Sequence, residues 1–256
     1  MRPNRVRERL AGGQPVYNGW LMLPDSLSAE FMAHAGFDAL TVDMQHGMVD
    51  FGAMLGMLTA ISTTDTTPLV RVPWLDPGLI MKVLDAGAYG VICPMINSRQ
   101  EAQQFVAATR YAPQGNRSFG PLRGALYGGA DYGSQANATV LNFAMIETAQ
   151  ALENIDAICS VEGLDAVYLG PADLSLCLTG QRRVDTLDGV LGDATRHILA
   201  RALAHGVHPC AHTSSPAFAL QLLAMGYRFV TCANDAQLLA AGAAGALAAM
   251  RAGQPR

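Results

Sequence analysis

The chain has 256 residues, of which 50% are hydrophobic and 15% are charged, so it carries enough apolar material for one large core or two small ones. Its formal net charge of −4 excludes a broadly basic surface and argues against nucleic acid as a partner. The first residues are basic, but no uninterrupted apolar segment follows them as a signal peptide or membrane span requires. We therefore expect a soluble, cytoplasmic protein without a membrane partner.

Short β-rich runs alternate with longer runs of helical periodicity along the whole chain, which is typical of repeated βα units. The expected strands, in chain order, are residues 16–21, 39–43, 68–72, 90–94, 141–146, 166–170, 207–211 and 229–232. The expected helices include residues 28–35, 77–86, 99–110 and 194–205, and several of them end at a glycine. Eight strands are the number that a closed parallel barrel needs. The pattern predicts one α/β domain over residues 1–256, a (β/α)₈ barrel.

Residues 111–138 interrupt this alternation, because they are rich in glycine and polar residues and lack a clear strand. Long irregular segments in compact domains are often functional lids or subunit contacts, and the alternative is a mobile surface loop. Arg117 and Arg123 lie in this segment. They are candidates to recognise a distal carboxylate of the substrate, or they are solvated loop arginines.

Polar and ionisable residues follow four of the predicted strands at the point where each strand ends. In a parallel barrel the carboxyl ends of the strands, and the loops after them, converge on one mouth. We therefore expect these side chains to meet there. The residues are Asp43, Gln45, His46, Arg71, Glu147 and Asp173.

Glu147 and Asp173 follow adjacent predicted strands, so their carboxylates can share one hard cation with water and substrate oxygens. Such a pair suits Mg²⁺ or Mn²⁺ better than zinc, since few nitrogen or sulfur ligands are expected nearby. The alternative is that each residue caps the helix that follows it. The two residues together, at neighbouring strand ends, favour the metal.

Arg71 and His46 are the candidates for charge stabilisation and proton transfer. A guanidinium at the barrel rim suits an oxyanion, and the alternative is a salt bridge with Asp43 or Asp76. His46 is a candidate general base, with Asp43 as the carboxylate that orients it. His212, at the end of the seventh predicted strand, is a second histidine candidate for the mouth.

The segments DMQHG, RVPW, IET and GPADLS, in this order, closely resemble the HpcH/HpaI aldolase family. The resemblance extends from NGWLML to the terminal alanine-rich helix. It implies a TIM barrel of the phosphoenolpyruvate/pyruvate-binding type and a metal-dependent class II pyruvate aldolase, as in 4-hydroxy-2-oxoheptanedioate aldolase and 2-dehydro-3-deoxy-sugar-acid aldolases. The implied substrates are pyruvate with an aldehyde, or a 4-hydroxy-2-oxo acid. The implied cofactor is Mg²⁺, Mn²⁺ or Co²⁺.

The resemblance also implies roles for individual residues. Glu147 and Asp173 hold the metal, His46 is the base, and Arg71 steadies the enolate. The backbone at Ala172 and Asp173 receives the pyruvate carboxylate.

One implied role involves a neighbouring subunit. From the sequence alone, Asp85 is interpreted as a solvated helix residue. The resemblance implies instead that the carboxylate at this position contacts the catalytic histidine of a neighbouring subunit and raises the basicity of that histidine. The resemblance further implies a homo-oligomer, a hexamer or trimer of dimers, with the final helix exchanged between subunits. The alternative is that this apolar helix packs on its own barrel.

Two departures from the family pattern affect the substrate-binding residues. Met145 stands where relatives carry a substrate-binding glutamine, and Gln45 stands where many carry glutamate. The only lysine, Lys82, lies within a predicted helix, which argues against a Schiff-base aldolase. The alternatives are an oxaloacetate decarboxylase or citramalyl-CoA-type lyase of the same superfamily, and a catalytically silent barrel that binds an oxo acid.

Overall fold

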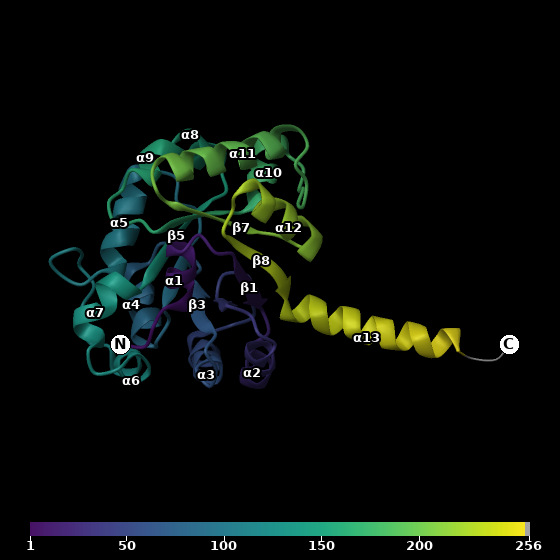
Figure 1. Ribbon diagram of the computed structural model, residues 1–256, viewed down its shortest axis with the longest axis horizontal. Coiled ribbons are helices and arrows are strands. Elements are labelled where there is room, and N and C mark those ends of the chain that lie inside the picture. Colours follow the sequence, from purple (N-terminus) through teal and green to yellow (C-terminus); the bar gives the residue numbers. More distant parts are fainter. Residues whose placement is uncertain (254–256) are drawn as a thin grey trace.

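Eight parallel strands pair in sequence order and close into a barrel in the computed structural model, which describes residues 1–253 (Figure 1). The last strand pairs with the first, and helices surround the barrel. The strands are β1 (Val16–Leu21), β2 (Ala39–Asp43), β3 (Thr67–Arg71), β4 (Gly90–Cys93), β5 (Leu141–Ile146), β6 (Ala166–Leu169), β7 (His208–His212) and β8 (Phe229–Asn234).

The helices before, between and after the strands vary from one to five turns in length. They are α1 (Arg5–Ala11), α2 (Ser26–His34), α3 (Phe51–Ile61), α4 (Pro77–Asp85), α5 (Arg99–Thr109), α6 (Leu122–Gly128), α7 (Tyr132–Thr139), α8 (Ala149–Glu153), α9 (Ile155–Cys159), α10 (Pro171–Thr179), α11 (Gly189–Ala204), α12 (Pro216–Met225) and α13 (Asp235–Ala252).

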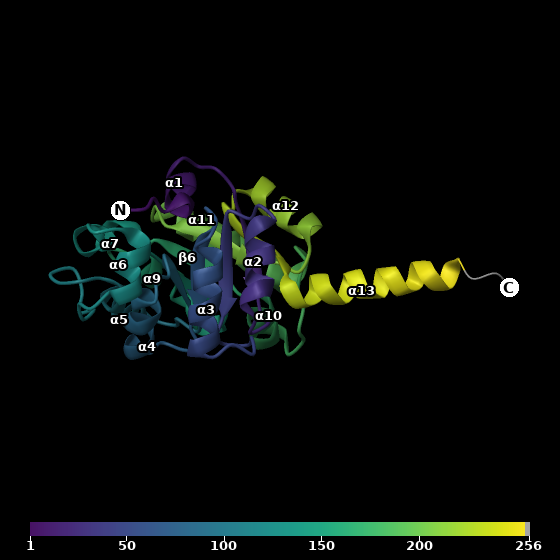
Figure 2. The ribbon, with the colours of Figure 1, turned by 90° about the horizontal axis from the view of Figure 1, so that it is seen from below.

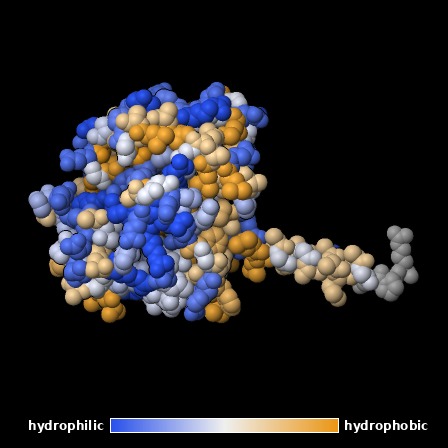
Figure 3. Space-filling view, viewed as in Figure 1, coloured by the Kyte–Doolittle hydropathy of each residue, from blue (hydrophilic) through white to orange (hydrophobic). Residues whose placement is uncertain are grey.

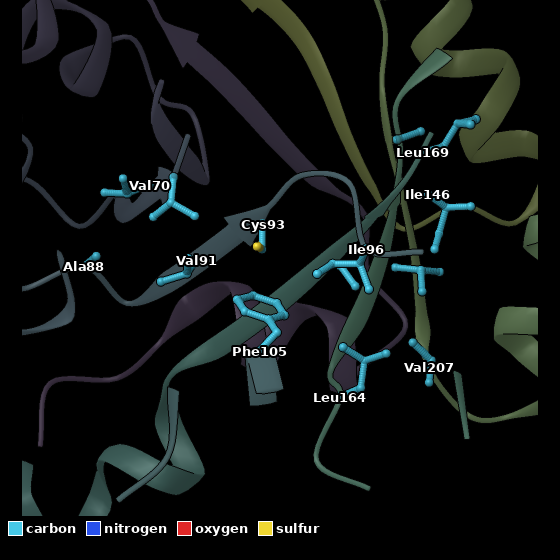
Figure 4. Close-up of a cluster of buried hydrophobic side chains, with 14 of the residues drawn as sticks. Val70, Ala88, Val91, Cys93, Ile96, Phe105, Ile146, Leu164, Leu169 and Val207 are labelled. Atoms are coloured by element: carbon cyan, nitrogen blue, oxygen red, sulfur yellow. The ribbon is translucent and has the colours of Figure 1, made fainter. Parts of the chain in front are cut away.

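The core has two shells, because successive side chains of a strand point to opposite faces. Val70 and Val91 point outward into the shell between strands and helices (Figure 4). Leu69 and Ile92, their neighbours in sequence, point into the barrel. The inner shell also contains Val6 and Leu10 of α1, so α1 closes one end of the barrel. The opposite end, where the strands terminate, stays open.

The predicted barrel is confirmed, and most predicted boundaries are close to the observed ones. Strands β1, β2 and β5 begin and end where the sequence predicts, and the other five differ by one or two residues at an end. Helix α11 begins five residues before its predicted start. The sequence did not predict this first turn because it contains glycines, which have low helix propensity. Residues 254–256 of the expected domain lie outside the described residues.

The prediction of an irregular segment over residues 111–138 was wrong, because it contains helices α6 and α7. Neither helix has a side-chain cap, and their glycines disfavour helix, so packing stabilises them. Tyr132 of α7 is fully buried in a cluster with Tyr89, Tyr111 and Ala136. Tertiary contacts of this kind are not visible in the local sequence.

Both readings of the two arginines in this segment were also wrong. Arg117 is only 5% exposed, and it donates hydrogen bonds to Asp85 Oδ1 at 2.6 Å and to the Tyr132 hydroxyl at 3.2 Å. Arg123 is half-buried and donates to the Ala86 carbonyl at 2.7 Å. Both side chains therefore tie the segment to α4 and its C-terminal end rather than facing solvent or substrate.

Helix α13 projects away from the barrel and touches it only near its first turn (Figures 1 and 2). There Asp235 accepts hydrogen bonds from the backbone N–H groups of Met22 at 2.9 Å and Leu23 at 3.1 Å. Beyond this anchor the helix is mostly apolar at its surface (Figure 3), with Leu239 66% and Met250 74% exposed. Within residues 1–253, no helix combines the length and apolar character needed to span a membrane.

Candidate active site

A cavity of about 410 Å³ opens at the carboxyl ends of the strands, and most of the predicted site residues line it. The predicted residues on its wall are Asp43, His46, Arg71, Met145, Glu147, Ala172 and Asp173. Further wall residues, which the sequence analysis did not single out, include Trp20, Met22, Arg182, Asn234 and Gln237. His212, the second histidine candidate, also lies on the wall.

Asp43 and Arg71 form a buried ion pair across the ends of β2 and β3, where they are direct partners in the strand register. Arg71 Nε donates to Asp43 Oδ1 at 2.9 Å, and Nη2 donates to Oδ2 at 2.6 Å. Trp20 Nε1 also donates to Oδ2, at 3.1 Å. Burial raises the pKa of Asp43, but the Arg71 hydrogen bonds and charge outweigh burial, so its pKa lies below the ordinary value. The pair is therefore ionised.

The expectation that Asp43 orients the His46 ring was wrong. Asp43 Oδ1 instead accepts from the backbone N–H groups of Gln45 at 3.0 Å and His46 at 3.3 Å, so it shapes the loop that carries the histidine. The next residue must be glycine, because a Cβ at Gly47 would lie 2.3 Å from the Asp43 carbonyl oxygen. The His46 side chain is exposed at the mouth.

Glu147 lies deeper in the cavity and is only 2% exposed. Its Oε1 accepts from the Met95 N–H at 2.8 Å, and Met95 adopts an uncommon positive φ of 54°. Its Oε2 lies so close to Gly170 that a Cβ there would be 2.5 Å away. Burial raises the pKa of Glu147 to about 7, and the charge of Asp173 adds to this increase. A cation beside both groups would stabilise the ionised form.

Neither carboxylate caps a helix, contrary to the alternative that the sequence left open. Thr148 caps α8, since its Oγ1 accepts from Ala151 N–H at 3.0 Å. The N-cap of α10 is Gly170, and Asp173 makes no side-chain hydrogen bond within residues 1–253. Both carboxylates thus remain available to a ligand.

The donor set fits a cation with an incomplete protein cage. Among residues 1–253, no group of three or more His, Cys, Asp or Glu side chains is arranged to hold a metal ion. A cation at Glu147 and Asp173 would receive oxygen ligands from these two side chains, and water and substrate oxygens would supply the others. Oxygen donors of this kind suit Mg²⁺ and Mn²⁺.

His212 lines the cavity and also belongs to a polar cluster inside the barrel. Its Nδ1 lies 3.3 Å from the Tyr168 hydroxyl, which lies 2.6 Å from Thr231 Oγ1. The Trp20 ring meets the His212 ring edge-on at 4.8 Å between centroids. Burial lowers the pKa of His212 to about 4, and Arg71 contributes to the decrease, so His212 is neutral at pH 7.

Three residues with expected or possible roles lie off the cavity wall. Gln45 Oε1 is buried and has no hydrogen-bond partner within residues 1–253. Asp85 pairs with Arg117 of the same chain, and its side chain is 23% exposed. The Lys82 ammonium lies over the Phe51 ring, 4.7 Å from its centroid, so it is not positioned for a Schiff base in the cavity.

Some of the missed wall residues carry a sequence signal, and others carry none. Trp20 is one residue from the end of β1, so the strand-end reasoning that found Arg71 applies equally to it. Arg182 lies in the loop after α10, and Gln237 lies in the first turn of α13. Their approach to the mouth depends on how α10 and α13 leave the barrel, which the local sequence does not reveal.

We expect His212 to make the protein less stable in mild acid. The folded state keeps this imidazole neutral down to about pH 4, whereas the unfolded chain takes up the proton near pH 6.5. The unfolded state binds more protons between these values, so this contribution to the free energy of unfolding falls as the pH falls from 6.5 to 4. Urea unfolding of wild type and His212→Gln across this range measures the difference in slope.

The exposed His197 on α11 provides the control for this measurement. His197→Gln should keep the wild-type dependence of stability on pH, whereas His212→Gln should flatten it. Equal slopes for wild type and His212→Gln would show that His212 is not held neutral in the folded protein.

Comparison with known proteins identifies the family. The family model described as HpcH/HpaI aldolase/citrate lyase matches residues 18–241. A hydroxypyruvate/pyruvate aldolase of Rhizorhabdus wittichii is 46% identical over 97% of this chain and 99% of that protein. A 5-keto-4-deoxy-D-glucarate aldolase of Shigella dysenteriae is 34% identical over 91% of each chain.

Solved structures agree with this result. A crystal structure of an HpcH/HpaI aldolase/citrate lyase family protein from Burkholderia cenocepacia superimposes with a TM-score of 0.90 at 32% identity, over 97% of this chain and 99% of that one. The citrate synthase SbnG superimposes with a TM-score of 0.87 at 31% identity, over 97% and 98% of the two chains. The chain therefore belongs to the HpcH/HpaI aldolase/citrate lyase family.

Proposed function

We propose that this protein is a divalent-metal-dependent class II pyruvate aldolase, which makes or breaks the C3–C4 bond of a 4-hydroxy-2-oxo acid. The observation that carries the proposal is one cavity lined by Glu147, Asp173, Arg71 and His46. The two similar curated relatives, both named as aldolases, support the reaction class. The name of the R. wittichii relative adds hydroxypyruvate to pyruvate as a candidate nucleophile.

Glu147 and Asp173 are the residues that would hold the cation, and Mg²⁺, Mn²⁺ and Co²⁺ are the candidates. When bound, such a cation supplies Lewis acidity to the 2-oxo group of the substrate. The substrate carboxylate would meet the backbone N–H groups of Ala172 and Asp173. These lie in the first turn of α10, where no side chain caps the free N–H groups.

Arg71 would stabilise the negative charge that develops on the C2 oxygen when the carbon–carbon bond breaks. Its Nε and Nη2 are held by Asp43, and Nη1 makes no hydrogen bond within residues 1–253. Nη1 is therefore the free donor of a guanidinium that the ion pair keeps in position. Preorganised donors of this kind lower the barrier without reorganising during the reaction.

His46 would remove the C4 hydroxyl proton during cleavage and return it during synthesis. Its exposed position at the mouth agrees with a group that meets the aldehyde end of the substrate. Asp85 is the proposed carboxylate from a neighbouring subunit that raises the basicity of His46. Asp85 is bound to Arg117 in its own chain but remains partly exposed, as a contact with a second subunit requires.

Met145 and Gln45 distinguish this site from the family pattern. Met145 is 2% exposed and lines the cavity, so it would pack against the substrate without offering a hydrogen bond. Gln45 would act indirectly, since it does not line the cavity.

A second candidate function is condensation or cleavage with a different partner of the enolate, favoured by the 31% identity to a citrate synthase. Oxaloacetate decarboxylation and citramalyl-CoA cleavage belong to this group, and a catalytically silent barrel is the remaining alternative. Assays of oxaloacetate and citramalyl-CoA beside 4-hydroxy-2-oxo acids separate these reactions. Exchange of pyruvate methyl protons in deuterated water separates an enzyme from a silent barrel.

Retro-aldol activity should require a divalent metal. We expect EDTA to abolish cleavage of 4-hydroxy-2-oxo acids, and Mg²⁺, Mn²⁺ or Co²⁺ to restore it. Glu147→Gln removes one ligand charge at nearly constant size, so it should weaken Mn²⁺ binding and lower kcat/KM about a hundredfold or more. Titration of Mn²⁺ followed by electron paramagnetic resonance measures binding independently of turnover.

The exposed Glu162 supplies the matched control, because Glu162→Gln removes a carboxylate far from the mouth and should change neither quantity. Full activity in the presence of EDTA would refute the metal-dependent mechanism.

His46→Ala should separate proton transfer from metal binding. We expect kcat to fall about a hundredfold or more, since a general base typically contributes a factor of this size. Mn²⁺ affinity should stay near the wild-type value, because His46 is not one of the proposed ligands. Unchanged turnover in the variant would remove His46 from the mechanism.

We also propose that the protein is a homo-oligomer, a hexamer built as a trimer of dimers, in which α13 packs on a neighbouring subunit. Helices in proteins are stabilised mainly by packing of an apolar face, and the exposed leucines of α13 have no partner in their own barrel among the described residues. Packing on another subunit would bury them.

Charges on α13 should therefore disrupt assembly. Leu239 and Leu247 are 66% and 50% exposed, and we expect Leu239→Asp with Leu247→Asp to reduce the molar mass measured by light scattering. Leu203→Asp on α11 is the control, since Leu203 is similarly exposed at 56% but lies on the barrel. An unchanged mass in the α13 variant would exclude the exchanged helix.

A further inference from the structure

A continuous chain of buried hydrogen bonds crosses the barrel interior and ends at His212. Thr41 Oγ1 donates to Asn18 Oδ1 at 3.0 Å, and Asn18 Nδ2 donates to Thr231 Oγ1 at 2.9 Å. Thr231 Oγ1 lies 2.6 Å from the Tyr168 hydroxyl, which lies 3.3 Å from His212 Nδ1. The first four residues are at most 1% exposed, so water does not compete for these bonds. The proposed aldol mechanism uses none of the five.

The number of available protons determines which group donates and which accepts in each of these hydrogen bonds. Thr231 Oγ1 accepts from Asn18, and within residues 1–253 the Tyr168 hydroxyl is the one partner that can accept the Thr231 proton. The Tyr168 proton then goes to His212 Nδ1. In the reverse direction the Thr231 proton would be buried without an acceptor, which is costly. The imidazole is therefore the tautomer that carries its proton on Nε2.

The Nε2–H group of His212 is available to a ligand in the cavity. His212 lines the cavity, and Nε2 makes no hydrogen bond within residues 1–253. It is also not one of the buried polar atoms that lack a partner, which are Gln45 Oε1, the Tyr111 hydroxyl and Arg117 Nε. Because the ring is neutral at pH 7, it acts as a hydrogen-bond donor and not as a cation.

His212 lies beside Arg71 on the cavity wall, next to the same aromatic ring. It contacts Trp20, and Arg71 stacks over the same Trp20 ring at 4.8 Å from its centroid. The charges that act on His212 are those of Arg71, Asp43 and Asp185. His212 thus belongs to the Arg71 side of the mouth.

A 2-oxo acid bound as proposed above would present its third carbon to this side. Its C1 carboxylate would meet the start of α10, and its C2 oxygen would face the cation and Nη1 of Arg71. C3, the remaining substituent of C2, would then be free to face the wall that carries His212. In pyruvate C3 is a methyl group, which offers the Nε2–H group no acceptor. In hydroxypyruvate C3 carries a hydroxyl, whose oxygen accepts a hydrogen bond.

We propose that His212 is a specificity-determining residue that donates its Nε2–H hydrogen bond to a hydroxyl on C3 of the 2-oxo acid. The inference rests on the proposed aldolase function and deepens it, by naming 3-hydroxy-2-oxo acids as the nucleophiles that the site prefers. Tyr168 and Thr231 are positioning residues, because they fix the tautomer and the orientation of the ring.

The test compares hydroxypyruvate with pyruvate as nucleophile, each with the same aldehyde. We expect His212→Leu to reduce the ratio of the two kcat/KM values about tenfold, the usual effect of losing one neutral hydrogen bond, while the reaction of pyruvate is largely retained. His212→Gln keeps a donor and should retain part of the preference. Tyr168→Phe should reduce the ratio less than His212→Leu, because it removes only the group that orients the ring.

His208→Leu is the matched control, since His208 is the histidine at the opposite end of β7 and does not line the cavity. It should leave the ratio at the wild-type value. An unchanged ratio in His212→Leu, in an enzyme that is active with pyruvate, would overturn the role of His212 while leaving the aldolase proposal intact.

Nitrogen NMR of the histidine rings tests the same inference without turnover. In wild type with Mg²⁺ we expect the His212 ring to be protonated on Nε2 at pH 7, and the Nε2 resonance to move on addition of hydroxypyruvate but not of pyruvate. A proton on Nδ1, or the same response to both acids, would overturn the proposal. This measurement decides the role of His212 even if neither acid is turned over and the aldolase proposal fails.

Discussion

The ion pair between Asp43 and Arg71 is the interaction on which the rest of the candidate site depends. A buried guanidinium is stable only if its charge and its donors are matched, and the carboxylate on the neighbouring strand does both. The same carboxylate accepts from Trp20 and from two backbone N–H groups of the loop that carries His46. One side chain therefore links the proposed oxyanion donor, the proposed base and the aromatic wall beside His212.

Two carboxylates of the cavity, those of Asp43 and Glu147, have opposite electrostatic environments, and this difference suggests different roles for them. Asp43 is compensated by a fixed cation, and its pKa is lowered. Glu147 receives one backbone hydrogen bond, is buried and faces the charge of Asp173, so its pKa is raised to about 7. The protein thus neutralises one carboxylate internally and leaves the other in need of an external positive charge. A divalent ion is the ligand that the second environment suits best.

The fold and the composition of the cavity wall followed from the sequence because both depend on local patterns. Short β-rich runs between helical runs located β1, β2 and β5, and the position of Arg71 and Glu147 at strand ends indicated that both would reach the mouth. The hydrogen-bond partners of the site residues were harder to predict from the sequence. Asp43 was predicted to orient the ring of His46, and a salt bridge between Arg71 and Asp43 was only the alternative role for Arg71. The salt bridge is confirmed, because the strand register of the closed barrel makes the two residues neighbours.

Other errors have the same origin. Helices α6 and α7 have weak intrinsic propensity and form where Tyr132 packs into a tyrosine cluster, and the burial of Arg117 depends on Asp85, 32 positions earlier in the chain. The chain of hydrogen bonds from Thr41 to His212 joins five different strands, so no window of sequence contains it.

Helix α1 closes one end of the barrel with Val6 and Leu10, and the cavity opens at the opposite end, where the strands terminate. Glu147 and Arg71 lie deep behind that opening, whereas His46 is exposed beside it. In the proposed aldolase, the oxo acid would therefore bind first, next to Glu147 and Arg71. The aldehyde would bind after it and leave before it, on the side of His46.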